Sequence, residues 1–298
     1  MTIKTYTYHL HELTDYINWL YFFHSWGFPP QFASIARQHA CPACQQAWVN
    51  SFPIAEREKA RTCLKLYQEA IEQLQQLDKD YVVRGICGLF QVTTQNDDII
   101  FNLSGKEIHF PCLRQQLQQE KDGVYLCLTD YINPCGDRIG VFATTVDAEM
   151  EKLFPDDSYQ HMLTQLLCDR LAEAAAEKMH QQIRIKDWGY APDEQLSPDD
   201  LFAEKYQGIR PAVGYPSLPD QSVNAIIEQI IGMNAIGITL TESGAMLPHA
   251  SVSGLMFSHP KARYFAVGKI GNDQLADYAQ RRGMPPEELE KFLSKNLL

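Results

Sequence analysis

One arginine stands in a stiff loop, which reads GIRPAVGYPSLP from residue 208 to 219. Proline fixes φ at three positions of this loop, and Gly214 allows a backbone conformation or close approach that a side chain would block. Such a stretch cannot satisfy its own amides and carbonyls in a helix or a central strand, so they must bond to water, another segment or a ligand. Arg210 therefore belongs either to a ligand site or to an ordinary salt bridge on a rigid surface loop.

A pair of cysteines is the second group that can do chemistry. The stretch HACPACQ places Cys41 and Cys44 in a Cys-x-x-Cys spacing beside His39. Half a metal site and a redox pair both use this spacing. A zinc site needs about four ligands, and no second Cys-x-x-Cys or paired histidine motif follows in the chain. The sequence therefore favours ordinary thiols here. The other six cysteines mostly lie in apolar segments, which is typical of buried free thiols.

A carboxylate on a predicted helix is the third candidate. The stretch 158–184 reads as a long helix, and Glu173 follows Leu166 by seven residues and Tyr159 by fourteen. The helical period places this carboxylate on or near the same face as two side chains of core type. Glu173 either faces a ligand or forms an exposed pair with neighbours at helical spacing.

The elements that must position these residues begin with an amphipathic helix over 55–78, where apolar residues recur at spacings of three and four. A strand meander is predicted over 81–146. Its breaks carry turn residues, and several are too short for a helical crossover, which predicts antiparallel pairing. The strand-like runs are 81–92, 98–103, 107–110, 124–132 and 138–146.

The second half of the chain follows the long helix with a connection over 185–219 that is rich in aromatic and proline residues. Connections of this length in a compact domain are usually functional or disordered, and its aromatic residues argue against disorder. Strands are predicted over 235–270, at 235–243, 251–258 and 263–270, and two helices over 272–298. Because strands group with strands and helices with helices, we expect one α+β domain over 1–298, a largely antiparallel mixed sheet flanked by long helices.

Composition excludes several classes of function. The chain has 298 residues, 45% of them hydrophobic, and a net charge of −11 with scattered lysines and arginines. This distribution predicts neither a nucleic-acid partner nor an anionic membrane partner. No signal peptide or long apolar segment is recognisable, so we expect a cytoplasmic protein. A glycine-rich phosphate loop and a nucleophile elbow are also missing from the sequence.

Several long, ordered motifs resemble one known family, the S-adenosylmethionine-binding activation domain of cobalamin-dependent methionine synthase. The similarity runs from about residue 15 to the end, and the insert around CPAC stands outside it. The motifs are GLF at 88–90 with DDI following, DRLAEA at 169–174, WGYAP at 188–192, YQGIRPAVGYP at 206–216, LTES at 240–243, SVSG and FSHP within 251–260, and the tail DYAQRRGM.

The resemblance implies a repair function. In that family, cobalamin that has fallen into the inactive cob(II)alamin state is restored by an electron from a flavodoxin-like donor and a methyl group from S-adenosylmethionine. The protein binds and orients the partners, while the chemistry belongs to the two cofactors. The resemblance assigns this chain no catalytic residue and no metal ligand.

The resemblance also implies ligand contacts in the proline-rich loop. A guanidinium suits the carboxylate of S-adenosylmethionine, which is the role implied for Arg210. Backbone groups of Ala212 and Gly214 would meet the adenine edge. Tyr215 would support the loop or face the corrin.

Further site residues follow from the same resemblance. Tyr264 and Phe265 match an adjacent aromatic pair at the ligand, where rings or backbone can contact a cation or base. Glu173 and Glu204 match acidic positions of the site. Asn18 stands where the family has an aspartate that touches the ligand, so a neutral amide replaces a charged acceptor. This change would cost a charge-assisted contribution of about 1–2 kcal/mol.

The organisation of the chain predicts action in trans. No homocysteine, folate or cobalamin module is recognisable in the sequence, so we expect a methyltransferase component that reactivates cobalamin on a separately encoded methionine synthase. Four alternatives remain open. The chain could reactivate another corrinoid methyltransferase, be an excised domain, bind S-adenosylmethionine as a sensor or scaffold without methyl transfer, or be a structural protein with a vestigial pocket.

Overall fold

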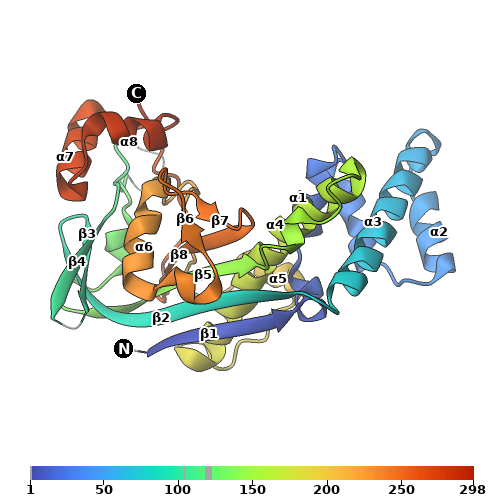
Figure 1. Cartoon of the computed structure of the whole chain (residues 1–298), viewed down its shortest axis with the longest axis horizontal. Coiled ribbons are helices and arrows are strands. Elements are labelled where there is room, and N and C mark those ends of the chain that lie inside the picture. Colours follow the sequence, from blue (N-terminus) through green and yellow to red (C-terminus); the bar gives the residue numbers. More distant parts are fainter. Residues whose placement is uncertain (1, 104, 118–122) are drawn as a thin grey trace.

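An antiparallel six-stranded sheet forms the centre of the molecule (Figure 1). The computed structural model describes residues 2–103, 105–117 and 123–298. The strands of the sheet are β1 (Thr2–His9), β2 (Val82–Gln95), β3 (Asp98–Leu103), β4 (Lys106–Pro111), β5 (Asp137–Val146) and β8 (Ser251–Met256).

The long strand β2 organises the sheet. The strand order is β4-β3-β2-β5-β8, and β1 pairs with β2 outside this path. Along β2, residues 82–89 pair with β1 and residues 92–95 pair with β3, while β5 pairs with residues 83–92. Every pairing is antiparallel. The strand β2 can pair with both β1 and β3 because its 14 residues exceed the length of either partner.

The two faces of the sheet bury two separate cores, as the alternation of side chains along a strand requires. Cys87 and Phe142, which are register partners, belong to the core on the face covered by α4 (Ser158–Gln182). Their neighbours Ile86 and Ala143 point to the opposite face, where α6 (Asn224–Ile231) packs. The sheet is therefore covered by α4 on one face and by α6 on the other.

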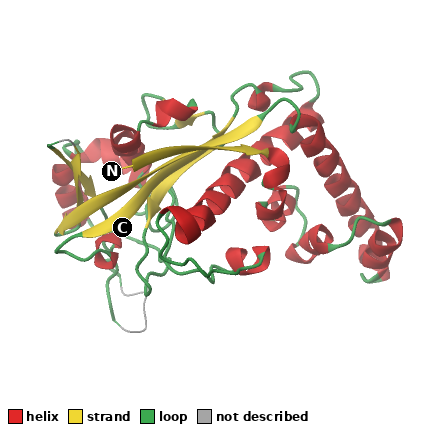
Figure 2. Cartoon of the chain, turned by 90° about the horizontal axis from the view of Figure 1, so that it is seen from below, coloured by secondary structure: helices red, strands yellow, loops and turns green. Residues whose placement is uncertain are grey.

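The remaining helices extend the molecule at both ends (Figures 1 and 2). At one end lie α1 (Trp19–Ser25), α2 (Pro42–Asn50) and α3 (Arg57–Leu77). At the other end, α7 (Asn272–Arg282) and α8 (Pro286–Leu293) lie near β3 and β4. A short helix, α5 (Pro198–Phe202), and a small hairpin of β6 (Thr239–Leu240) with β7 (Met246–Leu247) complete the regular elements, apart from short 3-10 and π segments.

The expected fold class, α+β with a largely antiparallel sheet flanked by helices, is confirmed. Three predicted strands were wrong. Within 124–132 the chain forms a 3-10 helix at Leu128–Tyr131, and its first turn is capped by Asp130, whose carboxylate accepts the Cys127 amide at 2.8 Å. Only Thr239–Leu240 is a strand within 235–243. The segment 263–270 joins no strand, because the Val267 amide bonds to the Pro216 carbonyl at 2.8 Å instead of to the sheet.

None of the helices in the described ranges combines the length and the apolar character that crossing a lipid bilayer requires.

Candidate functional site

One face of α4 carries the polar side chains nearest the proline-rich loop. Glu173, Glu177 and His180 follow one another at spacings of four and three, which place them on the same face of the helix. The helix around them is tightly packed by buried alanines at 172, 174, 175 and 176. This small-residue packing lets α4 approach the sheet closely, and the Thr144 hydroxyl donates to the Ala172 carbonyl at 2.9 Å.

The loop that contains Arg210 runs along β8 as an irregular extra strand. The Val213 amide donates to the Ser253 carbonyl at 2.9 Å, and the Leu255 amide donates to the Pro211 carbonyl at 3.0 Å. A Cβ on Gly254 would lie 2.2 Å from the Pro211 carbonyl oxygen. The loop can reach the sheet edge only because residue 254 has no side chain.

Arg210 forms a buried ion pair with Glu177. Its Nη2 lies 3.0 Å from Glu177 Oε2, and each side chain is 10% exposed. Burial opposes the charge on Arg210, but Glu177, Tyr264, Tyr206 and Glu173 together outweigh it and raise the pKa of the guanidinium. The Arg210 Nε and the Glu177 Oε1 are buried and have no hydrogen-bond partner within the described chain. The pair thus keeps an unused donor and an unused acceptor that are both buried.

Two tyrosines hold the backbone at Arg210. The Tyr264 hydroxyl accepts the Arg210 amide at 2.9 Å and lies 3.0 Å from the Tyr206 hydroxyl. Phe265, the predicted partner of Tyr264, is buried, and its ring centroid lies 6.4 Å from that of Tyr131 in the core. The Tyr264 side chain therefore belongs with Arg210, Glu177 and Tyr206 to one group of contacts, the Arg210 cluster. The ring of Phe265 packs in the core, so only the Phe265 backbone is available to a ligand.

His180 is a further buried polar group beside this cluster. Its ring packs edge-on against Tyr206 with centroids 5.0 Å apart. Both ring nitrogens lack a partner among the described residues. Desolvation, followed by the positive charges of Arg184 and Arg210, lowers the pKa of His180 well below its usual range. The imidazole is therefore neutral at neutral pH, with one donor and one acceptor to offer.

The exposed edge of the cluster is formed by Tyr215. Its hydroxyl donates to the Glu173 carboxylate, and its side chain is 50% exposed. Gly214 adopts a φ of 87°, and its amide donates to the Leu218 carbonyl at 2.8 Å. The Ala212 carbonyl accepts the Tyr215 amide at 3.2 Å. The Ala212 amide and the Gly214 carbonyl take part in no hydrogen bond between the described residues.

Among the described residues, Glu204 and Asn18 form no hydrogen bond or ion pair with Arg210. Asn18 is the N-cap of α1 and accepts the Leu20 amide at 3.2 Å. It lines a cavity of about 700 Å³ together with Phe202 and other residues of α5. Glu204 follows shortly after, with a φ of 55°. Desolvation and the negative charge of Glu177 raise the pKa of Glu204, opposed by Arg210, so it lies within electrostatic reach of the ion pair.

A buried ion pair between Arg184 and Glu194, the Arg184–Glu194 clasp, holds the connection over 185–219. The fully buried Arg184 donates through Nε and Nη2 to the two carboxylate oxygens of Glu194, both at 2.7 Å. The Arg184 guanidinium carbon also lies 4.2 Å from the centroid of the Tyr206 ring. The α5 helix within the connection is capped by Ser197 and Asp200. These contacts give the aromatic connection its fixed path toward Arg210.

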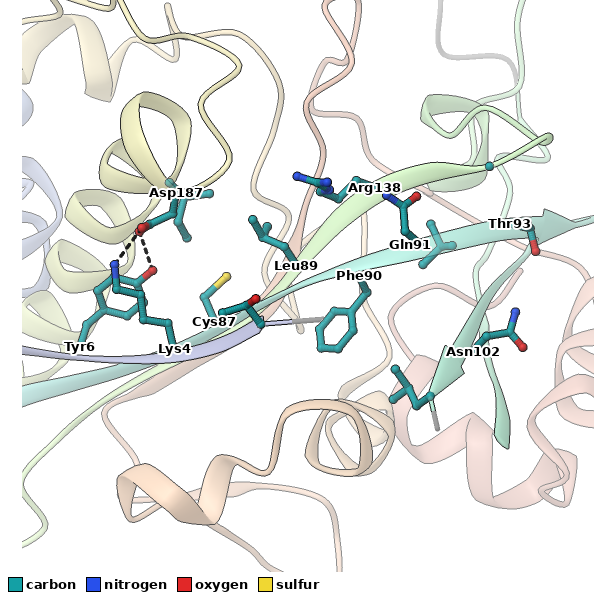
Figure 3. A pocket seen from close by; sticks show the side chains of 15 residues that line it. Lys4, Tyr6, Cys87, Leu89, Phe90, Gln91, Thr93, Asn102, Arg138 and Asp187 are labelled. Carbon is teal, nitrogen blue, oxygen red and sulfur yellow. Dashed lines mark hydrogen bonds and ion pairs between the residues drawn. The ribbon is translucent and has the colours of Figure 1, made fainter. Parts of the chain in front are cut away.

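A separate cavity of about 560 Å³ lies on the same sheet face, beyond the end of α4 (Figure 3). At its rim, Asp187 accepts hydrogen bonds from Lys4 and Tyr6, both at 2.8 Å. Arg138 and Gln91 lie farther along the same face. None of the site residues predicted from the sequence lines this cavity.

The structure brings together Glu173, Arg210, Tyr215 and Tyr264, with Ala212 and Gly214 in the same loop. Among the described residues, Asn18 shares no hydrogen bond or ion pair with any of them. Sequence reasoning missed Glu177 and His180. The signal was present, since Glu177 follows Glu173 by one helical turn and His180 lies three residues further.

Comparison with known proteins defines the class of this fold and site. Residues 9–283 match the family described as vitamin B12-dependent methionine synthase, activation domain. The chain belongs to this family.

A solved relative is also similar over the whole chain. The crystal structure of the MetH reactivation domain bound to AdoHcy superposes with a TM-score of 0.84 and 35% sequence identity. The match covers 100% of this chain and 90% of that one.

Proposed function

We propose that this protein binds S-adenosylmethionine beside Arg210 and supports the reductive methylation of cob(II)alamin held by a partner module. The relative with AdoHcy bound supports the ligand class, since AdoHcy is S-adenosylmethionine without its transferable methyl group. Membership of the activation-domain family supports the reaction. When bound, S-adenosylmethionine supplies the methyl group, and this chain's residues bind and orient it.

The observation that carries the proposal is the set of unused polar atoms around Arg210. Arg210 Nε, Glu177 Oε1 and both ring nitrogens of His180 are buried without partners in the described chain. Leaving such groups unsatisfied costs about 1–3 kcal/mol each. Their concentration at one place is what a site for a polar ligand requires.

The chemistry of these groups fits S-adenosylmethionine. Arg210 can bind the ligand's carboxylate through the guanidinium atoms that Glu177 does not use. The acidic groups Glu173, Glu177 and Glu204 provide a negative environment for the ammonium and the sulfonium. The free Ala212 amide and Gly214 carbonyl match the acceptor and donor on an adenine edge.

Calorimetric titration with S-adenosylmethionine tests this placement. We expect the unsubstituted protein to bind and Arg210→Ala to lose binding. Arg210→Lys keeps the charge but not the planar fork, so it should bind more weakly than the unsubstituted protein. Arg138→Ala is the matched control, because Arg138 is an exposed arginine lining the other cavity.

Unfolding curves of each variant separate loss of the site from loss of the fold. Binding that survives in folded Arg210→Ala but disappears in Arg138→Ala would move the ligand to the cavity of Figure 3 and refute the placement.

The corrinoid partner, the electron donor and action in trans are part of the same proposal. A separately purified cobalamin-binding module of a methionine synthase, mixed with this protein, S-adenosylmethionine and reduced flavodoxin, should form methylcobalamin. Binding of S-adenosylmethionine without any methylcobalamin would favour a sensor or scaffold. The N-cap role of the Asn18 side chain supports that second function, because it leaves the amide oxygen less free for a ligand.

A further inference from the structure

The segment that contains α2 lies at the end of the molecule away from α7 and α8 (Figure 1). At its start, the chain leaves a 3-10 segment (Pro30–Arg37) and enters α2 through Cys41, the N-cap residue. Its cysteines differ from those of the core. Cys41 and Cys44 are partly exposed, whereas five other cysteines are buried and Cys135 is exposed.

Three potential metal ligands converge at this helix start. The ligand atoms of His39, Cys41 and Cys44 all lie within 4.8 Å of one another. Across residues 2–103, 105–117 and 123–298, no other group of three or more His, Cys, Asp or Glu side chains has this arrangement. The proposed S-adenosylmethionine site uses none of these residues.

The backbone holds the three ligands in place. The Cys44 amide donates to Cys41 Sγ at 3.3 Å, and the Cys41 amide donates to His39 Nδ1 at 3.2 Å. The first contact satisfies one of the free amides of the helix N-terminus. The second places the histidine ring beside the two thiols in the metal-free chain, and a metal would replace the Cys41 amide at the imidazole lone pair. The cluster is thus arranged by local chain geometry without a distant segment.

The ligand set selects for a soft or borderline cation. Two thiolates and an imidazole are typical zinc ligands, at about 2.3 Å for sulfur and 2.0–2.1 Å for nitrogen. Tetrahedral coordination at these lengths separates ligand atoms by roughly 3.3–3.8 Å. Small side-chain rotations therefore suffice to close the observed arrangement. Three protein ligands leave the fourth position to water.

We propose that His39, Cys41 and Cys44 bind one zinc ion at the N-terminus of α2, with a water molecule as the fourth ligand. The site stands apart from the Arg210 cluster and is independent of the proposed function. The sequence alone favoured ordinary thiols because it offered no fourth ligand, whereas the structure shows a clustered three-ligand set with an open side.

Cobalt substitution tests the proposal. The whole reduced chain, stripped of metal with a chelator, is titrated with cobalt(II) chloride and then with zinc chloride. We expect one cobalt ion per chain, intense visible bands typical of tetrahedral cobalt, a thiolate-to-cobalt charge-transfer band, and displacement of both by zinc. Weak bands typical of octahedral cobalt, or no thiolate band, would overturn the proposal.

Variants assign the ligands. Loss of an outer partner of a metal ligand already costs about 10–100-fold in affinity, so His39→Ala and Cys44→Ser should each weaken binding by at least about 100-fold. Cys41→Ser should do the same while keeping α2, because serine is a good N-cap. Cys135→Ser is the matched control and should bind cobalt like the unsubstituted chain. A thiolate band that survives in Cys41→Ser/Cys44→Ser, or is lost in Cys135→Ser, refutes the assignment.

Discussion

Arg210 and Glu177 join the proline-rich loop to α4 through one contact of 3.0 Å, between Nη2 and Oε2. The neighbouring atoms Nε and Oε1 are buried and unpartnered in the described chain. This single contact holds the proline-rich loop against α4. The other polar atoms of the ion pair remain available to a ligand. A fully satisfied bidentate pair would leave Arg210 little capacity for a second carboxylate.

The Arg210–Glu177 pair should behave as a coupled unit in stability. Glu177→Leu leaves a buried guanidinium without its counter-charge, and Arg210→Met leaves a buried carboxylate, so each should cost about 3–5 kcal/mol. The double variant should cost less than either single change, because a hydrophobic pair needs no desolvation of charge. Urea unfolding of the four proteins measures the coupling.

The exposed Arg61–Glu58 pair is the control for this cycle. Its removal should change the free energy of unfolding by less than about 1 kcal/mol. Strictly additive losses in the Arg210–Glu177 cycle would show that the two side chains do not interact in solution.

His180 should make stability depend on pH in the acid range. Its folded-state pKa lies well below its usual value because of desolvation and the charges of Arg184 and Arg210. Below about pH 6.5 the unfolded chain therefore binds a proton that the folded chain excludes. The stability contribution is complete above this pH and declines as pH falls toward the folded pKa, by about 1.4 kcal/mol between pH 7.5 and 5.5.

Urea unfolding at both pH values, for the unsubstituted chain and for His180→Asn, isolates this contribution. Other groups titrate in both proteins and cancel in the comparison, including His109, whose pKa is raised by Asp98 and Glu107 against the effect of desolvation. The unsubstituted protein should lose more stability on acidification than the variant. Equal losses would mean that His180 is protonated in the folded state.

The sequence predicts some of this architecture and misses the rest for physical reasons. The helical period of α3 is visible locally, since its buried face repeats every three or four residues. The helix α4 is buried on most sides, so no single apolar stripe marks it in the sequence. The apolar run at 263–270 is equally suggestive of a strand, but hydrogen bonding to the Pro216 carbonyl decides its path. The resemblance located Arg210. Its pairing with Glu177 depends on two segments that meet only in the folded chain.

The Arg184–Glu194 clasp should control the order of the connection before Arg210. Glu194→Ala leaves the fully buried Arg184 without its carboxylate, so it should cost about 3–5 kcal/mol. It should also speed proteolytic cleavage within 185–207, which limited digestion with mass spectrometry would detect. Asp199→Ala removes an exposed ion pair with Arg37 in the same connection and should leave the cleavage rate unchanged. Equal cleavage of both variants would contradict a role for the clasp.

Gly254 lets the Arg210 loop lie against the strand β8, so we expect the ligand site to depend on this glycine. An alanine Cβ there would lie 2.2 Å from the Pro211 carbonyl oxygen and 2.9 Å from Ala212 Cα, both backbone atoms that cannot rotate away. The loop must then move off β8, which should cost about 1–3 kcal/mol of stability. If Arg210 and the Ala212 amide hold S-adenosylmethionine, this shift should weaken binding at least about tenfold, or about 1.4 kcal/mol.

Gly85→Ala is the matched control for Gly254→Ala, since its Cβ would meet the flexible Met179 side chain, with Sδ at 3.2 Å. It lies in the same sheet and should cost some stability without changing affinity, because the atoms nearest to its Cβ belong to Met179, Thr144 and Ala143 and not to the Arg210 loop. Calorimetric titration with S-adenosylmethionine and urea unfolding of both variants separate the two effects. If Gly254→Ala binds the ligand as tightly as the unsubstituted chain, the position of the loop on β8 does not determine the site, and the ligand must be held by residues other than Arg210 and Ala212.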